Sequence, residues 1–167
     1  ALELSIEASE RLTMVHAQIL LHRRYANKAA SSSTLGVKVA SSRFDEPLRD
    51  LLQNNADIIA IPMRWSEIEQ QEGTFTWGGI DRWVKWARDH RKNIIAGPLL
   101  DFTNETGIPE WVKALEFDYI QLRDKCYDHI ERVIHRYGSA VSFWNISSGI
   151  NLNRHVQLSL SNMVDLI

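Results

Sequence analysis

Apolar residues recur at helical spacing near the N-terminus and in shorter, denser runs further along the chain. Over residues 5–28, Leu12, Val15 and Ile19 repeat at intervals of three or four with charged residues between them, which predicts a helix. The stretch AASSSTLG then interrupts this spacing and predicts a loop. We therefore divide the chain into an N-terminal helix and loop, residues 1–34, and a second region, residues 35–167.

In the second region, strand-like and helix-like patterns alternate. Short runs rich in apolar residues predict strands at residues 35–42, 57–63, 93–100 and 140–149. Longer periodic segments predict helices at residues 45–55, 77–91, 116–138 and 160–167. Two of the strands, DIIAIPM and NIIAGPLL, are apolar throughout, which is typical of a parallel sheet covered on both faces.

Two architectures fit this alternation. A doubly wound sheet that binds a dinucleotide needs a glycine-rich turn after its first strand, and that turn reads ASSRFDE here. A (β/α)8 barrel needs about 250 residues, roughly twice what the second region holds. The chain also ends on the apolar VDLI without a helix-ending signal. We predict an α/β fold of the TIM-barrel type, cut within the barrel, with only about the first four βα units present.

Composition and charge restrict the partners that the chain can take. Its 167 residues carry a net charge of −2, so we expect no general attraction to nucleic acid or to an anionic membrane. No run approaches the roughly 18 apolar residues of a membrane span. Cys126 is the only cysteine, so no internal disulfide can form, and the cellular compartment stays open.

The histidines give no sign of a metal centre. The six histidines never stand at the close spacing of a metal-binding motif; they are residues 16, 22, 90, 129, 135 and 155. We interpret them as surface or capping residues and expect neither a metal site nor another cofactor.

The stretch MRWSEIEQQEGTFTWGGIDRWVKWAR, residues 63–88, resembles glycoside hydrolase family 10, the endo-1,4-β-xylanase family. In that family an M-K-W-type triplet ends a strand and an I-E-P-x-x-G-x-F-x-F segment follows. Downstream, P-x-W, RYG and xFWN sequences stand here in the family's order, at residues 109–111, 136–138 and 142–145. The resemblance covers about residues 35–165, and it implies a TIM barrel that acts on a polysaccharide or oligosaccharide.

The resemblance also implies a retaining mechanism, in which one carboxylate protonates the leaving oxygen and a second attacks the sugar. The family's acid/base ends strand four, and its nucleophile ends strand seven. Aligning Trp144 with the family's tryptophan puts Gly149 at the acid/base position, and glycine cannot donate a proton. Strand seven lies outside the four predicted strands. We therefore assign no catalytic residue in this chain.

Candidate substrate-binding residues lie near the ends of the predicted strands. The side-chain alternation of the fourth strand directs Asn145, Ser147 and Gly149 toward the barrel interior. The other candidates are Arg64, which keeps the positive charge of the family's lysine, Trp65 as a sugar-stacking platform, and Asp101 on the rim. For each of them a purely structural role is the alternative, and we expect Glu67, Glu69 and Glu72 to be structural.

Three hypotheses follow. The chain is part of a family 10-like barrel without its usual acid/base, so we expect poor or no xylanase activity from it. Alternatively, it is a non-catalytic carbohydrate-binding or scaffold domain. In either case a half barrel leaves two open sheet edges and an uncovered apolar interior, so we expect the chain to form a homo-oligomer.

Overall fold

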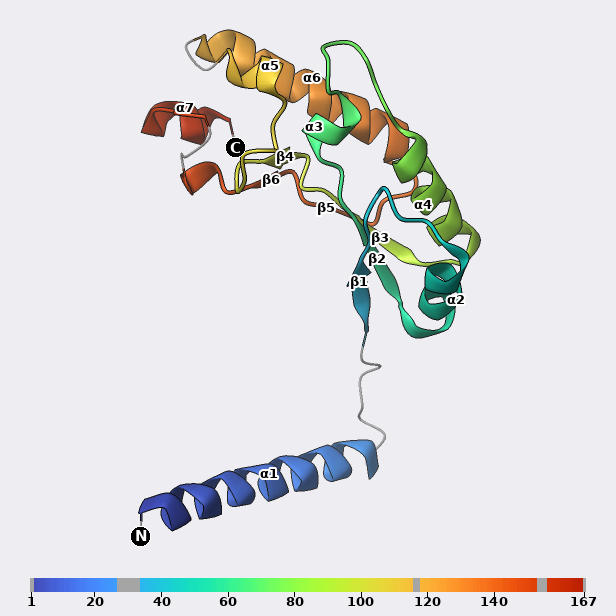
Figure 1. The fold of residues 1–167 in the computed structure, drawn as a ribbon, viewed down its shortest axis with the longest axis vertical. Helices are drawn as coiled ribbons and strands as arrows, with labels where there is room; N and C mark the ends of the chain where they lie inside the picture. Colours follow the sequence, from blue (N-terminus) through green and yellow to red (C-terminus); the bar gives the residue numbers. More distant parts are fainter. Residues whose placement is uncertain (1, 27–33, 116–117, 153–155, 167) are drawn as a thin grey trace. The chain divides into compact units, whose positions relative to one another are not determined.

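The computed structural model describes residues 2–26, 34–115, 118–152 and 156–166. The chain divides into two compact units, Ala1–Thr34 and Leu35–Ile167. The first unit holds one helix, α1 (Leu2–Ala26), drawn in blue in Figure 1. Within the described ranges, no helix is both long and apolar enough to cross a membrane.

The second unit is built on a parallel sheet. Four strands pair side by side in chain order, namely β1 (Gly36–Lys38), β2 (Ile58–Ile61), β3 (Asn93–Ala96) and β5 (Phe143–Trp144). Two further strands, β4 (Leu100–Asp101) and β6 (Ser147–Ser148), pair in parallel beyond β3 and β5. The order shows no reversal of the kind that divides a doubly wound sheet, so it favours the barrel architecture.

Helices follow the strands, as the alternating pattern predicted. The longer ones are α2 (Glu46–Asn55), α4 (Gly78–Asp89) and α6 (Tyr119–Tyr137), and α7 (Leu160–Asp165) follows a 3-10 turn, η1 (Ile150–Leu152). Asp45 caps α2, because its Oδ1 accepts a hydrogen bond from the Leu48 N–H at 3.0 Å. Sequence patterns did not predict the short helices α3 (Trp65–Ile68) and α5 (Glu110–Lys113).

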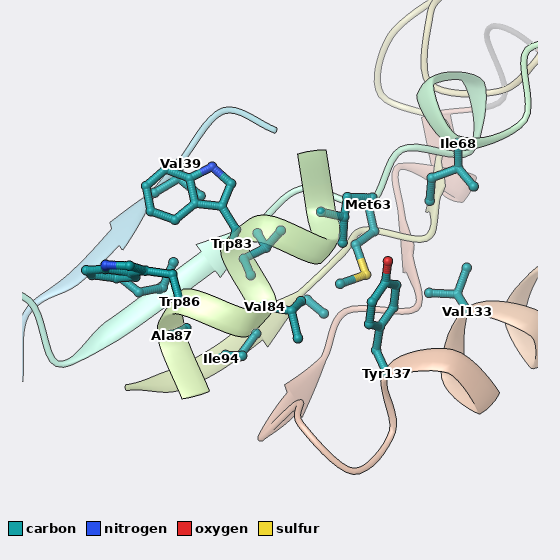
Figure 2. Close-up of a cluster of buried hydrophobic side chains, with 14 of the residues drawn as sticks. Val39, Met63, Ile68, Trp83, Val84, Trp86, Ala87, Ile94, Val133 and Tyr137 are labelled. Atoms are coloured by element: carbon teal, nitrogen blue, oxygen red, sulfur yellow. The ribbon is translucent and has the colours of Figure 1, made fainter. Parts of the chain in front are cut away.

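One face of the sheet packs against α4 and α6. Alternate strand residues such as Ile59, Ile61 and Ile94 are fully buried there, because side chains on a strand point to the same face at every second position. Figure 2 shows Trp83, Trp86 and Val84 of α4 with Val133 and Tyr137 of α6 in this cluster. Trp144 also packs on it. A second cluster, which includes Trp65, Leu100, Val112, Leu122 and Cys126, lies beneath α5 and α6.

Within the second unit, no described element covers the opposite face of the sheet. Ala60, Ile95 and Phe143 stand in one register row, and Lys38 pairs with Ala60. None of these residues is buried, and Phe143 is 63% exposed. Parallel sheets in globular proteins are normally covered on both faces, so this face is the open interior of a partial barrel.

A bulge interrupts the pairing of the third and fourth predicted strands. Three residues separate Ala96 from Leu100, whereas two separate their partners Trp144 and Ser147. Gly97 makes the bulge possible, because its φ is +114° and an added β-carbon would lie 2.1 Å from the carbonyl oxygen of Asn145. The bulge places Ser147 beside Leu100, so the simple alternation expected along this strand does not hold.

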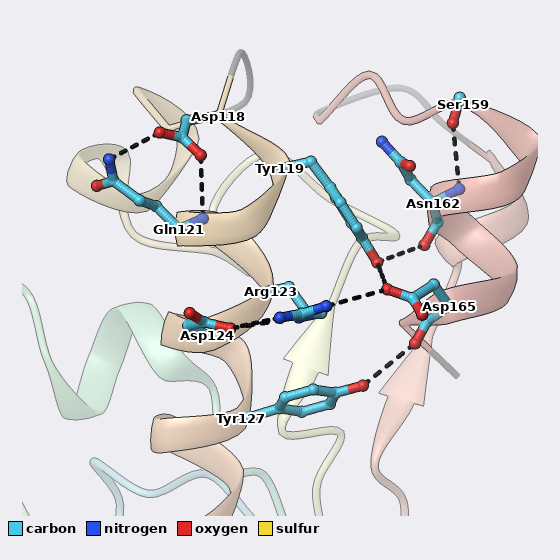
Figure 3. A network of polar contacts seen from close by, with 9 residues as sticks. All are labelled: Asp118, Tyr119, Gln121, Arg123, Asp124, Tyr127, Ser159, Asn162 and Asp165. Atoms are coloured by element: carbon cyan, nitrogen blue, oxygen red, sulfur yellow. Dashed lines mark hydrogen bonds and ion pairs between the residues drawn. The ribbon is translucent and has the colours of Figure 1, made fainter.

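A polar network joins α7 to α6 (Figure 3). The Tyr119 hydroxyl donates to Asp165 Oδ2 at 2.6 Å and lies 3.1 Å from the carbonyl oxygen of Asn162. The Tyr127 hydroxyl donates to the Asp165 carbonyl at 3.1 Å, and the Arg123 guanidinium lies 3.7 Å from the Asp165 carboxylate. Burial and the bond to Asp165 raise the pKa of Tyr119 to about 12, so the phenol stays a donor at neutral pH.

Candidate functional site

The loops that follow the C-terminal ends of the parallel strands form the candidate site, because functional sites of such sheets lie at that end. A cleft of about 510 Å³ opens between the segment after β1 and the end of β2. Its lining includes Lys38, Ser41, Pro62, Arg64 and Glu67. The cleft therefore has two cations and one carboxylate beside apolar groups such as Val39 and Pro62.

Glu67 ties the two sides of this cleft together. Its Oε2 accepts a hydrogen bond from Ser41 Oγ at 2.8 Å, and its Oε1 lies 2.7 Å from Arg64 Nη1. The carboxylate thus holds the Arg64 side chain, which is 38% exposed and open to a ligand. The sequence pointed to Arg64 but not to Lys38 or Ser41, although both follow directly from the end of the first strand.

Trp65 lies in the core and offers no free ring face. It is 1% exposed, stacks on the His129 ring at 4.6 Å between centroids, and meets the edge of Trp111 at 5.7 Å. Its indole nitrogen donates to Glu69 Oε2 at 2.8 Å. A sugar-stacking role for Trp65, expected from the sequence, does not fit this position, because the tryptophan begins the short helix α3 and turns inward.

The Asp101 carboxylate also already accepts hydrogen bonds from neighbouring residues. The residue is 6% exposed, and its Oδ1 accepts from the backbone N–H and the hydroxyl of Thr103. Its Oδ2 accepts from Asn104 Nδ2 at 2.9 Å. The carboxylate therefore shapes the loop after β4, which is the structural alternative that the sequence left open.

Asn145 and Ser147 were both expected to point toward the barrel interior, but one is exposed to solvent and the other has a buried hydroxyl. Asn145 is exposed, and its Nδ2 donates to Ser148 Oγ at 3.1 Å. Ser147 Oγ is buried and has no hydrogen-bond partner among the described residues. The bulge at Gly97 explains the difference, because it sets Ser147 beside the buried Leu100.

Gly149 ends the fourth predicted strand just after β6. Its φ is +77°, a region that residues with a side chain rarely adopt. An added β-carbon would lie 2.7 Å from Thr103 Cγ2 and 2.9 Å from the Thr103 nitrogen. The position therefore holds no carboxylate, and the surrounding loop leaves no space for one.

His129 corrects one expectation from the sequence, which treated all histidines as surface or capping residues. It is 2% exposed, and burial, aided by the nearby Arg132, lowers the pKa of its ring to about 3. The signal was present in the sequence: His129 stands three residues after Cys126 and four before Val133, on the apolar stripe of α6. His155 lies outside the described residues, and among the described ones no three histidine, cysteine or acidic side chains gather to hold a metal ion.

Comparison with known proteins identifies the fold and the family. The model of glycosyl hydrolase family 10 matches residues 24–154. Among solved structures, a GH10 endoxylanase from a sugarcane soil metagenome matches with a TM-score of 0.59 and 21% identity, over 68% of this chain and 35% of that one. Xylanase B from Clostridium stercorarium matches with a TM-score of 0.63 and 12% identity, over 80% of this chain and 46% of that one. These matches confirm the predicted partial TIM barrel.

Curated relatives are named as endo-1,4-beta-xylanases. Endo-1,4-beta-xylanase B of Humicola insolens is 28% identical over 83 residues, covering 50% of this chain and 22% of that protein. Endo-1,4-beta-xylanase A of Fusarium oxysporum f. sp. lycopersici is 26% identical over 125 residues, covering 72% of this chain and 37% of that protein. The match thus spans only 22% and 37% of the length of these two relatives. Its matched residues make it a member of glycosyl hydrolase family 10.

Proposed function

We propose that this chain binds a xylan-type polysaccharide but does not hydrolyse it, because the family's proton donor is missing. The named relatives are endo-1,4-beta-xylanases, and this supports a β-1,4-linked xylan chain as the ligand. The open strand-end cleft beside Arg64 provides a place for part of such a chain.

The observation that carries the proposal is the backbone at Gly149. In a retaining glycosidase a carboxylic acid must protonate the leaving oxygen, and losing such a positioned acid typically lowers the rate by about 10²–10⁴-fold. Gly149 has no side chain, and its positive φ and contact with Thr103 oppose any replacement. The nearest described carboxylate along β4, Asp101, already accepts hydrogen bonds from Thr103 and Asn104.

Binding in this proposal depends on groups that can reach solvent. Arg64 donates hydrogen bonds to sugar hydroxyls while Glu67 holds its guanidinium in place, and Lys38 supplies a second donor from the β1 side of the cleft. Asn145 contributes its exposed amide at the end of β5. We leave Trp65 and Asp101 out of this set, because the Trp65 ring already stacks on His129 and the Asp101 carboxylate already accepts a hydrogen bond from Asn104.

Calorimetric titration with xylohexaose, together with chromatography of the same samples, tests the proposal. We expect saturable binding without shorter products, and Arg64→Ala should weaken that binding. Arg91→Ala, at an exposed residue after α4, is the matched control and should bind as the unaltered chain does. Absence of binding, or release of shorter xylo-oligosaccharides, would contradict the proposal.

We further propose that copies of the chain associate through the uncovered face of the sheet. The exposed Phe143 in the row with Ala60 and Ile95, and the unpaired outer edge of β1, support this proposal. Sedimentation of the unaltered chain and of Phe143→Lys tests it. We expect a dimer or larger species that Phe143→Lys converts to monomer, and a monomeric unaltered chain would contradict it.

A further inference from the structure

A second groove lies over α6 and shares no lining residue with the cleft beside Arg64. It consists of two adjoining clefts of about 190 and 270 Å³, which have Asp128 and Arg132 in common. The smaller cleft extends toward the loop between α3 and α4, which passes over α6 in Figure 1, and it includes Phe75 and Trp111. The larger one extends along α6 to His135.

The two shared residues are free to take a ligand. Asp128 and Arg132 stand one helical turn apart, and neither makes a hydrogen bond or ion pair with a residue that the structure describes. The Arg132 guanidinium lies 4.5 Å above the Phe75 ring, which holds it over the groove. At one end, the 2.7 Å ion pair between Lys125 and Glu72 closes the smaller cleft.

His129 lines the smaller cleft and is an independent sign of an incomplete site. The residue is 2% exposed, and neither ring nitrogen has a hydrogen-bond partner among the described residues. Buried polar atoms in native proteins are rarely left unpaired, because they lose their hydrogen bonds to water without replacement. Trp111, whose indole nitrogen donates to the Glu69 carbonyl at 3.2 Å, adds a half-buried aromatic wall beside it.

The chemistry of the groove selects the class of ligand. The groove carries both carboxylates and cations, namely Glu69, Glu72, Asp128 and Glu131 beside Lys125 and Arg132. A strongly charged ligand of either sign would therefore meet like charges. The charged lining also opposes an apolar ligand, and the described residues offer no set of three metal-binding side chains. A neutral ligand rich in hydroxyl groups can donate to Asp128 and accept from Arg132 at the same time.

We propose that this groove is a second carbohydrate site, which binds a neutral oligosaccharide on the outer surface of the partial barrel. The α6 residues that border it, 125–135, extend over about 15 Å at 1.5 Å per residue, enough for a short oligosaccharide. The choice of xylo-oligosaccharide as the sugar rests on the function proposed above. The groove gives the chain a second point of attachment to a long polysaccharide.

Nuclear magnetic resonance of the 167-residue chain during titration with xylotetraose tests this inference. We expect the amide signals of residues 125–135 to shift in a saturable way. Asp128→Ala and Arg132→Ala, both at exposed positions, should each weaken that response about tenfold. Arg88→Ala, exposed on α4, is the control and should leave it unchanged. Unaltered affinity in both groove variants would overturn the inference.

The same spectra separate this inference from the proposed function. Shifts at residues 38–67 without shifts at 125–135 would overturn the second site and leave the strand-end cleft as the binding site. Shifts confined to 125–135 would support the groove and contradict binding beside Arg64. No response in either region would overturn both. A competing titration with citrate should not displace the sugar from the groove, and displacement would overturn the choice of a neutral ligand.

Discussion

Gly149 lies against Thr103 with no room between them for a side chain. A β-carbon on Gly149 would sit 2.7 Å from Thr103 Cγ2, and the φ of +77° is itself unfavourable for any residue other than glycine. We therefore predict that Gly149→Glu does not restore a proton donor. The variant should lose about 1–3 kcal/mol of unfolding free energy in urea and release no reducing sugar from xylan.

Gly149→Ala separates the two effects of that replacement, because it adds the same β-carbon without a carboxylate. It should lose nearly as much stability as Gly149→Glu. Hydrolysis of xylan by Gly149→Glu alone would show that the loop accommodates the acid and would contradict our account of this strand end.

Gly97 has a comparable role between the third and fourth predicted strands. An added β-carbon would lie 2.1 Å from the Asn145 carbonyl oxygen, so we expect Gly97→Ala to cost about 3 kcal/mol or more in unfolding free energy. Gly73→Ala is the matched control, since Gly73 also has a positive φ, +76°, but nothing within 4 Å of its β-carbon position. It should lose only about 1 kcal/mol. Equal losses in urea unfolding would mean that the bulge does not require the close approach.

The buried ring of His129 predicts a pH-dependent stability. Its pKa is about 3 in the folded chain, against about 6.5 for an exposed histidine. The unfolded chain therefore binds a proton between these values and the folded chain does not. The contribution of neutral His129 to the unfolding free energy should be fully present above pH 6.5. Below that pH the unfolding free energy should fall toward pH 3, by at most about 1.4 kcal/mol per pH unit.

Urea unfolding between pH 7 and pH 4 measures this slope. His129→Phe retains a ring beside Trp65 but cannot titrate, so its stability should depend less on pH than that of the unaltered chain. His135→Phe, at an exposed position on the same helix, should keep the original slope. Identical slopes for all three proteins would exclude His129 as the cause.

The attachment of α7 depends mainly on Tyr119, whose hydroxyl contacts both Asn162 and Asp165. Tyr119→Phe removes both contacts, so we expect faster hydrogen exchange at residues 160–166 by about tenfold. Tyr127→Phe removes a single bond, to the Asp165 carbonyl, and should have a smaller effect. The reverse order of the two variants would show that Tyr127 is the main tether.

Periodicity predicted the elements whose packing is regular. The all-apolar second and third strands predicted buried strands, and Ile59 and Ile94 are fully buried; the periodic apolar residues of α6 predicted its packed face, and Val133 is fully buried there. The cap at Asp45 followed from local chemistry alone. In these elements each side chain's environment is set by its position within one helix or strand, which is why sequence patterns sufficed.

Details of the candidate site depend on contacts between distant segments, and these were less predictable. The bulge at Gly97 changes which strand residue stands opposite Ser147, and a period of two cannot reveal it. Trp65 turns inward because it can stack on His129, which lies more than sixty residues later in the sequence. The Asp101 carboxylate is a local exception: it accepts hydrogen bonds from Thr103 and Asn104, two and three residues later, in a turn that hydrophobic periodicity does not reveal.

We propose that the fourth strand ends without a proton donor, and a hydrolysis assay tests this proposal most directly. The purified 167-residue chain should be incubated with xylan, whose leaving oxygen must be protonated. We predict no release of sugar above the rate without protein. Steady hydrolysis of xylan with retention of anomeric configuration would contradict the account.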